Sequence, residues 1–244
     1  MTNPSFGASD YWSAAWQRHI NAYLAAPPRC GIWLESLFSE GDFSFLECAG
    51  GSCRDSRFLF QKKRKALGSD FDEHTVNYIN EKHSTSGFIL QTEDAFRLGF
   101  DSKSFDIVFH NGFWVLFDDD QIVCSLLTEQ VRVASRYVVA LVHNKCNQAL
   151  VNTFSEKSLK DDLYKIRFFD VDALMRIVEL SGIKFRSVSF QKFGGPVDRL
   201  YALGSKIPFV MPLACWIVPR LYRYQPWSRV ERIALVIELN EASS

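Results

Sequence analysis

The stretch that decides the fold is Phe43–Asp55, which reads FSFLECAGGSCRD. Its first half is mostly apolar and favours a short buried strand. The small residues Ala49, Gly50 and Gly51 then end the strand, and the polar residues after them begin a helix. Small residues let a backbone approach a ligand closely, and a helix N-terminus offers free N–H groups to an anion. A ligand site is therefore predicted where this strand meets this helix.

Strand and helix continue to alternate after this stretch. The predicted helices are Ser52–Lys65, Asp72–His83, Gln121–Ser135 and Val171–Leu180. The predicted strands after the first are Lys65–Phe71, Gly87–Gln91, Ser104–Phe109, Tyr137–His143, Ile183–Phe190 and Arg232–Leu239. Strands that are apolar on both faces and alternate with helices indicate a parallel sheet covered on both sides. The predicted fold class is therefore α/β, doubly wound.

Composition narrows the function further. The chain has 28 Lys and Arg residues and 28 Asp and Glu residues, so its net charge is zero. Because no net positive charge would attract nucleic acid, nucleic acid is not expected as a partner. No apolar run reaches the roughly 18–20 residues that span a bilayer, and the start of the chain lacks the pattern of a secretory signal. The six cysteines form no C-x-x-C pair, so no metal site is predicted, and a reducing cytoplasm is the expected location.

Four strand-to-helix turns would lie side by side at the carboxyl edge of the predicted sheet, where ligands bind in this fold. The first is the glycine turn after Glu47. The second contains Asp70, about 20 residues beyond the glycine turn, at the spacing where a carboxylate meets ribose hydroxyls. The third contains Asp94, and the fourth begins with His110 and Asn111. One aspartate alone is typical of a helix cap, but the four turns together favour a cofactor that contains ribose.

From about Phe43 to Asn144 the chain resembles the class I S-adenosylmethionine-dependent methyltransferases. It is most similar to the type-11-like subgroup, which acts on small molecules, lipids and sugars. The first family motif is an acidic residue followed by alternating glycines, and it falls on Glu47, Ala49, Gly51 and Cys53. Two of its three glycines are therefore replaced.

The resemblance implies an S-adenosylmethionine-dependent methyltransferase, with S-adenosylhomocysteine as the product. It implies a Rossmann-like, seven-stranded, mostly parallel sheet with an antiparallel last strand. Asp70 would hold the ribose hydroxyls, Phe71 would pack against adenine, and Asp94 would face the adenine amino group. The segment with Tyr11 and Trp12 would close over the cofactor. The expected cofactor-binding residues are Tyr11, Glu47, Ala49, Gly50, Gly51, Asp70, Phe71, Asp94, Ala95, His110 and Asn111.

We expect a single methyltransferase domain over residues 1–244. Its parts would be an N-terminal helical lid (1–40), a cofactor-binding core (43–193), an apolar and aromatic insertion (194–231), and the last strand and tail (232–244).

Two histidines, His110 and His143, end the predicted fourth and fifth strands. A histidine at this edge can act as a general base, which a poorly acidic hydroxyl acceptor would need. It can equally be a polar wall of the pocket. Both interpretations of both residues stay open.

The insertion contains an apolar run, Ile207–Pro219. Arginines interleaved with aromatic residues follow it: Arg220, Arg223, Arg229 and Arg232. Such a segment suits peripheral membrane contact through 207–232, or contact with a lipid-linked substrate. A hydrophobic lid and a homodimer contact are the alternatives. Prolines at 208, 212 and 219 argue against a long regular helix here.

The expected acceptor is a small molecule or a glycan- or lipid-linked compound, in polysaccharide or lipid biosynthesis, with oxygen, nitrogen and carbon acceptors all open. The alternative function is a non-catalytic binding or scaffold protein that retains the fold, since two motif glycines are replaced. A nicotinamide dehydrogenase would need G-x-G-x-x-G, which residues 49–54 do not supply.

Overall fold

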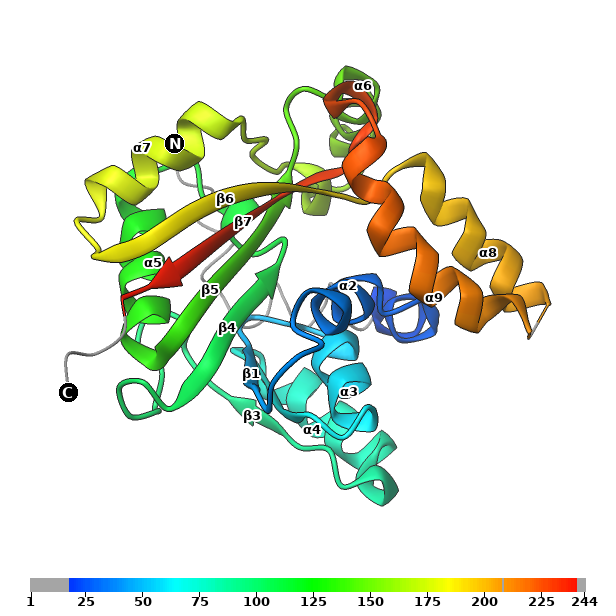
Figure 1. Ribbon diagram of the computed structural model, residues 1–244, viewed down its shortest axis with the longest axis horizontal. Helices are drawn as coiled ribbons and strands as arrows, with labels where there is room; N and C mark the ends of the chain where they lie inside the picture. The colour runs from blue at the N-terminus through cyan, green and yellow to red at the C-terminus, as the bar shows by residue number, and fades with distance from the viewer. Residues whose placement is uncertain (1–17, 208, 241–244) are drawn as a thin grey trace.

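The computed structural model describes residues 18–207 and 209–240, which form one seven-stranded sheet with helices on both faces (Figure 1). The strands are β1 (Ser44–Glu47), β2 (Lys65–Asp70), β3 (Leu90–Thr92), β4 (Phe105–Asn111), β5 (Ala134–His143), β6 (Phe185–Phe193) and β7 (Arg232–Leu239). Their order is β3-β2-β1-β4-β5-β7-β6. Strand β7 pairs antiparallel with β5 and β6, whereas the pairs among β1 to β5 are parallel. The predicted Rossmann-like sheet with an antiparallel last strand is confirmed.

Helices cover both faces because the central strands are apolar on both sides. One face carries α5 (Asp120–Val133) and α7 (Val171–Leu180). The other carries α2 (Arg29–Leu37), α3 (Arg54–Gln61), α8 (Arg199–Lys206) and α9 (Val210–Leu221). Within β4, Val108 belongs to the first cluster, while Ile107 and Phe109 belong to the second. Helix α4 (Glu73–Lys82) packs beside β3, and α6 (Gln148–Ser158) follows β5.

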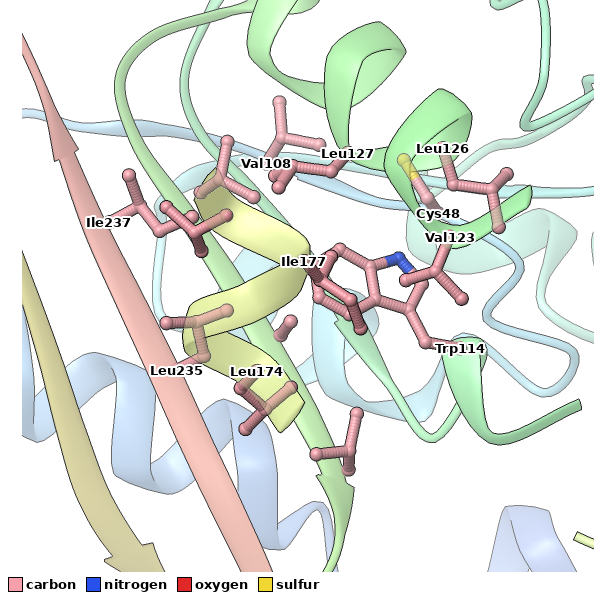
Figure 2. Packing of buried hydrophobic residues seen from close by; sticks show 14 of the residues in the cluster. Cys48, Val108, Trp114, Val123, Leu126, Leu127, Leu174, Ile177, Leu235 and Ile237 are labelled. Carbon is pink, nitrogen blue, oxygen red and sulfur yellow. The ribbon is translucent and has the colours of Figure 1, made fainter. Parts of the chain in front are cut away.

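The larger core cluster lies between the sheet and helices α5 and α7. Its largest member is Trp114, which is fully buried in the 3-10 turn η3 (Trp114–Leu116). Figure 2 shows its ring beside Val123 of α5 and Ile177 of α7. Because Trp114 follows β4 closely, this packing holds the turn at the carboxyl end of that strand.

Several predicted elements have different ends in the structure. Helix α2 lies within the helical segment expected over 1–40, whereas α6, α8 and α9 were not predicted. Helix α3 ends at Gln61 rather than Lys65, since Lys63 adopts a left-handed φ of 64°. Strand β3 begins at Leu90 rather than Gly87, because Phe88 first turns into an apolar cluster beneath α4.

The insertion 194–231 folds as a hairpin of α8 and α9, which projects from one side of the molecule (Figure 1). Helix α9 includes Pro212 and Pro219, although these prolines argued against a long regular helix. Pro212 lies in the first helical turn, where backbone N–H groups have no partner within the helix. Across the described residues, no helix is both long and apolar enough to cross a membrane.

Candidate active site

A cavity of about 930 Å³ lies at the carboxyl ends of strands β1, β2, β4 and β5. Strand order reverses between β1 and β4, which is where doubly wound sheets bind ligands. We call one part of its wall the acidic half: Glu47, Ala49, Gly50, Asp55, Asp70, Phe71, Glu93, Asp94 and Ala95. The aromatic half is Phe113, Val115, Leu116, Phe117, Ile122, His143, Phe154, Leu163, Tyr164 and Ile166.

The turn after β1 holds two residues other than glycine in the left-handed region. Ala49 has a φ of 49°, and Cys53 has a φ of 42°. A residue with a Cβ pays roughly 1–2 kcal/mol to adopt this conformation. These are the two glycine positions of the family motif at which this chain has another residue. The turn therefore keeps the backbone shape of the glycine motif, and the substitutions store strain beside the cavity.

Asp70, at the end of β2, holds this turn from the neighbouring strand. Its Oδ2 accepts a hydrogen bond from the Gly51 N–H (2.7 Å), and its Oδ1 accepts one from the Asp72 N–H (3.0 Å). Burial raises the pKa of Asp70, and these two donors oppose the rise. A carboxylate has about four acceptor positions, so Asp70 can order the loop and still accept bonds from ligand hydroxyls.

Two buried carboxylates lie next to the turn. Oε2 of Glu47 accepts hydrogen bonds from the backbone N–H (2.8 Å) and the hydroxyl (2.6 Å) of Ser56. Oδ1 of Asp55 accepts one from the Gly31 N–H (2.9 Å). Burial, together with the charge of Asp55, raises the pKa of Glu47 to about 8. Glu47 therefore holds a proton near neutral pH.

A chain of polar contacts runs from Asp55 under the cavity. Oδ2 of Asp55 accepts a hydrogen bond from Asn111 (3.1 Å), whose Oδ1 accepts one from Arg232 (2.7 Å). Arg232 lies 3.6 Å from Glu231, and Glu231 pairs with Arg29 at 2.9 Å. The chain ties α2, α3, β4 and β7 together and places a guanidinium beside the cavity.

The two histidines occupy different environments. His143 lines the cavity, and its Nδ1 has no hydrogen-bond partner among the described residues. Burial and the charge of Arg232 hold the pKa of His143 well below its usual value, so the imidazole is neutral at pH 7. His110 is fully buried and does not line the cavity, and its Nδ1 accepts a hydrogen bond from the Phe113 N–H (3.3 Å). Burial lowers the pKa of His110 to about 3.

Two segments outside the sheet contribute to the cavity wall. Helix α6 places Phe154 next to His143, and the 3-10 turn η4 (Asp162–Tyr164) places Tyr164 next to Phe154. The ring centroids of His143 and Phe154 are 5.0 Å apart, and those of Phe154 and Tyr164 are 5.4 Å apart. Helical residues 18–25 meet this segment, since His19 Nε2 lies 3.6 Å from Asp161 Oδ2.

The structure brings together most of the residues that the sequence predicted for the cofactor. Those that line the cavity are Glu47, Ala49, Gly50, Asp70, Phe71, Asp94, Ala95 and Asn111. Gly51 and His110 do not line the cavity. Gly51 donates a backbone hydrogen bond to Asp70, which does line it. Tyr11 and Trp12 fall outside the described residues. Within the predicted lid, His19 and Tyr23 line the cavity, whereas α2 packs on the sheet face.

The cavity residues that escaped the sequence analysis include Arg54, Arg232 and Phe154. By sequence, Arg232 groups with the arginines of the insertion, yet antiparallel pairing sets it opposite His143. The sequence feature that could have identified Arg232 is its position as a charged residue at the start of a mostly apolar strand. Nothing in the sequence around Phe154 marks it, because α6 has no buried residue and hence no strong apolar pattern.

Comparisons with known proteins agree with this geometry. Residues 46–139, which carry the four turns, match the family model of the methyltransferase domain, type 11. No curated protein sequence matches the chain. A Thermotoga maritima structure described as an S-adenosylmethionine-dependent methyltransferase, possible histamine N-methyltransferase, is 15% identical, with a TM-score of 0.58 and coverage of 92% of this chain and 98% of that one.

Two further solved structures have the same fold. Magnesium protoporphyrin IX methyltransferase from Synechocystis is 12% identical, with a TM-score of 0.52 over 92% of this chain and 83% of its own. Geranyl diphosphate C-methyltransferase from Streptomyces coelicolor is 9% identical, with a TM-score of 0.55 over 95% of this chain and 84% of its own.

The resemblance to class I, type-11-like methyltransferases is therefore confirmed: the chain contains an S-adenosylmethionine-dependent methyltransferase domain. S-adenosylmethionine is the cofactor of such a domain, and the residues present fit it. Carboxylates end β2 and follow β3, the turn between β1 and α3 keeps the backbone of the motif, and the exposed Phe71 ring stands at the edge of the acidic half.

Proposed function

We propose that this methyltransferase acts on a bulky, largely apolar small molecule, or on the apolar part of a glycan- or lipid-linked acceptor. The aromatic half of the cavity carries this proposal, because its side chains are apolar or aromatic apart from one neutral imidazole. Asp118 and Lys165 lie beside these residues in the cavity wall. Two enzymes with similar structures are named for substrates with a large apolar part, magnesium protoporphyrin IX and geranyl diphosphate, which supports this class of acceptor.

In this proposal the acidic half holds the cofactor. The glycine turn and the N-terminus of α3 face the methionine part, Asp70 faces the ribose, and Asp94 with Ala95 faces adenine. The separation of the halves supports the assignment, since β2 and β3 lie on one side of β1 and β5 lies on the other.

S-adenosylmethionine would supply a methyl group bound to its sulfonium. The acceptor nucleophile would bond to that methyl carbon in line as the carbon–sulfur bond breaks, S-adenosylhomocysteine would leave, and the acceptor would lose its proton. We assign His143, which lines the cavity, to accept that proton. Its lowered pKa keeps the base form present at pH 7, although it also makes the base weaker. Phe154 and Tyr164 would exclude water from the reacting atoms. His110 remains the second candidate base, and it would need the Phe113 turn to move before it could reach an acceptor.

The first test is calorimetric titration with S-adenosylmethionine and S-adenosylhomocysteine. Micromolar binding, about 8 kcal/mol, supports the enzyme, and no binding of either supports the non-catalytic alternative. The second test measures S-adenosylhomocysteine release with phenols and alcohols that carry alkyl, prenyl or sugar groups.

The histidine assignment is tested with the pair His143→Gln and His110→Gln on the best acceptor. We expect His143→Gln to lower kcat by about 100-fold with cofactor affinity unchanged, as for loss of a general base. An equal or larger loss of kcat in His110→Gln would overturn it.

A further inference from the structure

One face of α9 is exposed and apolar. Phe209 precedes the helix with 83% of its surface exposed, and Leu213 and Trp216 are 56% and 57% exposed. Their spacing of four and three residues places them on one side of the helix. Ala214 and Val218, on the other side, are buried against the body of the protein. We call the exposed residues at this site the hairpin patch: Leu203, Phe209, Leu213, Trp216, Arg220, Arg223 and Tyr224.

The charge around the patch has one sign. Residues 199–230 contain five Lys or Arg residues and no Asp or Glu, so the rest of the chain carries five more acidic than basic residues. The guanidinium of Arg220 lies 4.6 Å from the centre of the Trp216 ring, and that of Arg223 lies 4.7 Å from the Tyr224 ring. Arg220 and Arg223 thus place cationic groups beside the two aromatic rings of the patch.

We propose that the hairpin patch docks on the surface of an anionic lipid bilayer. Apolar side chains on one face of a short helix enter the boundary between headgroups and acyl chains, while flanking arginines stay at the phosphates. Trp216 and Tyr224 are of the types that favour this boundary. At 12 residues, α9 can lie along the membrane but cannot cross it.

Two other occupants fit less well. A symmetric contact with a second copy would set the same patch against itself, and so would oppose cations with no acidic residue from 199–230 to pair with them. Nucleic acid would neutralise the arginines but would leave Phe209 and Leu213 uncovered. A bilayer with anionic headgroups satisfies both the charge and the apolar stripe.

The base of the hairpin is joined to the floor of the cavity. Asp198, just before α8, pairs with Arg29 and accepts a hydrogen bond from the Tyr222 hydroxyl (2.6 Å). Arg29 also pairs with Glu231, the neighbour of Arg232 in the cavity wall. The hairpin is therefore anchored to the domain rather than loosely attached. The inference goes beyond the proposed function, because it holds whatever the acceptor is.

Flotation of the full chain with vesicles tests the proposal. We compare vesicles of phosphatidylcholine alone with vesicles of equal parts phosphatidylcholine and phosphatidylglycerol. The protein is expected to float with the anionic vesicles and to be released by high salt, which screens the arginines. Absence of binding to anionic vesicles, or equal binding to both kinds, would overturn the proposal.

Matched variants locate the contact. Leu213→Ser combined with Trp216→Ser should weaken vesicle binding about tenfold or more, and so should Arg220→Glu combined with Arg223→Glu. The controls change exposed residues elsewhere, Ile89→Ser with Leu180→Ser and Lys184→Glu, and should bind as the wild type does. Equal losses in the control variants would refute the site.

Sedimentation of the same proteins without lipid, and calorimetry with S-adenosylmethionine, complete the experiment. The patch variants should keep both the mass and the cofactor affinity of the wild type, because their residues lie outside the cavity. A wild-type dimer that the patch variants dissociate would assign the face to a second copy and overturn the membrane proposal.

Discussion

The two halves of the cavity are built in different ways. The acidic half comes from turns within one contiguous stretch, β1 to the residues after β3, and it relies on backbone geometry and carboxylates. The aromatic half comes from η3, α5, β5, α6 and η4, and it relies on side chains that meet only after folding. A site built from backbone turns and carboxylates can be recognised from a short stretch of sequence. A pocket built from aromatic side chains of distant elements cannot.

The comparison predicts that substitutions in the acidic half change stability and cofactor binding, and that substitutions in the aromatic half change only the use of the acceptor. The hairpin patch would affect neither. Variants from each half therefore test whether the two halves have separate roles.

The largest effect is expected from Glu47→Gln at alkaline pH. The folded-state pKa of about 8 lies above the unfolded value of about 4.3, so the folded protein holds a proton that the unfolded chain releases. The contribution of Glu47 to stability is full below about pH 4.3 and declines as the pH rises towards about 8. Glu47→Gln should therefore gain about 4 kcal/mol in stability relative to wild type between about pH 5 and pH 8.5. Urea unfolding across this range measures it, and parallel curves for the two proteins would contradict it.

Asp70→Ala is the next largest. It removes two charge-assisted hydrogen bonds that hold the glycine turn, as well as the proposed ribose contact. We expect S-adenosylmethionine to bind about 100-fold more weakly by calorimetry. Asp170→Ala, which removes the N-cap carboxylate of α7 away from the cavity, is the matched control and should bind normally. A normal affinity in Asp70→Ala would remove this turn from the cofactor site.

Phe154→Ala should separate the two halves. It deletes a ring that packs on His143 and lines the aromatic half. We expect kcat/KM for the acceptor to fall about tenfold, with the affinity for S-adenosylmethionine unchanged. Leu159→Ala, one residue beyond α6 and 87% exposed, controls for loss of an apolar side chain. Loss of cofactor affinity in Phe154→Ala would show that the halves are not independent.

The smallest effect is a gain. Ala49→Gly should raise the free energy of unfolding by about 1 kcal/mol, because glycine adopts a φ of 49° without strain. Gly51→Ala, at a φ of 55° in the same turn, should lower the stability by a similar amount. Urea denaturation measures the free energy of unfolding of both variants. A lower stability of Ala49→Gly than of the wild type would argue against strain in this turn.

Much of the fold could be predicted from the sequence, because strands buried on both faces leave long apolar runs. The bounds of α7 and β7 agree with the prediction. Strand β3 begins three residues later than predicted, because Gly87 ends a 3-10 turn although the residues after it are apolar. Helix α6 escaped prediction because none of its residues is buried, so no apolar periodicity marks it.

The sequence by itself determined the class of the protein and the acidic half of its site. The residues concerned, from Glu47 to Asp94, lie at turns whose order and spacing follow directly from the alternation of strand and helix. Only the tertiary structure decided which histidine reaches the cavity, that Arg232 and Phe154 belong to it, and that the apolar insertion presents an exposed stripe. Those facts depend on contacts between residues far apart in the chain, and no local pattern encodes them.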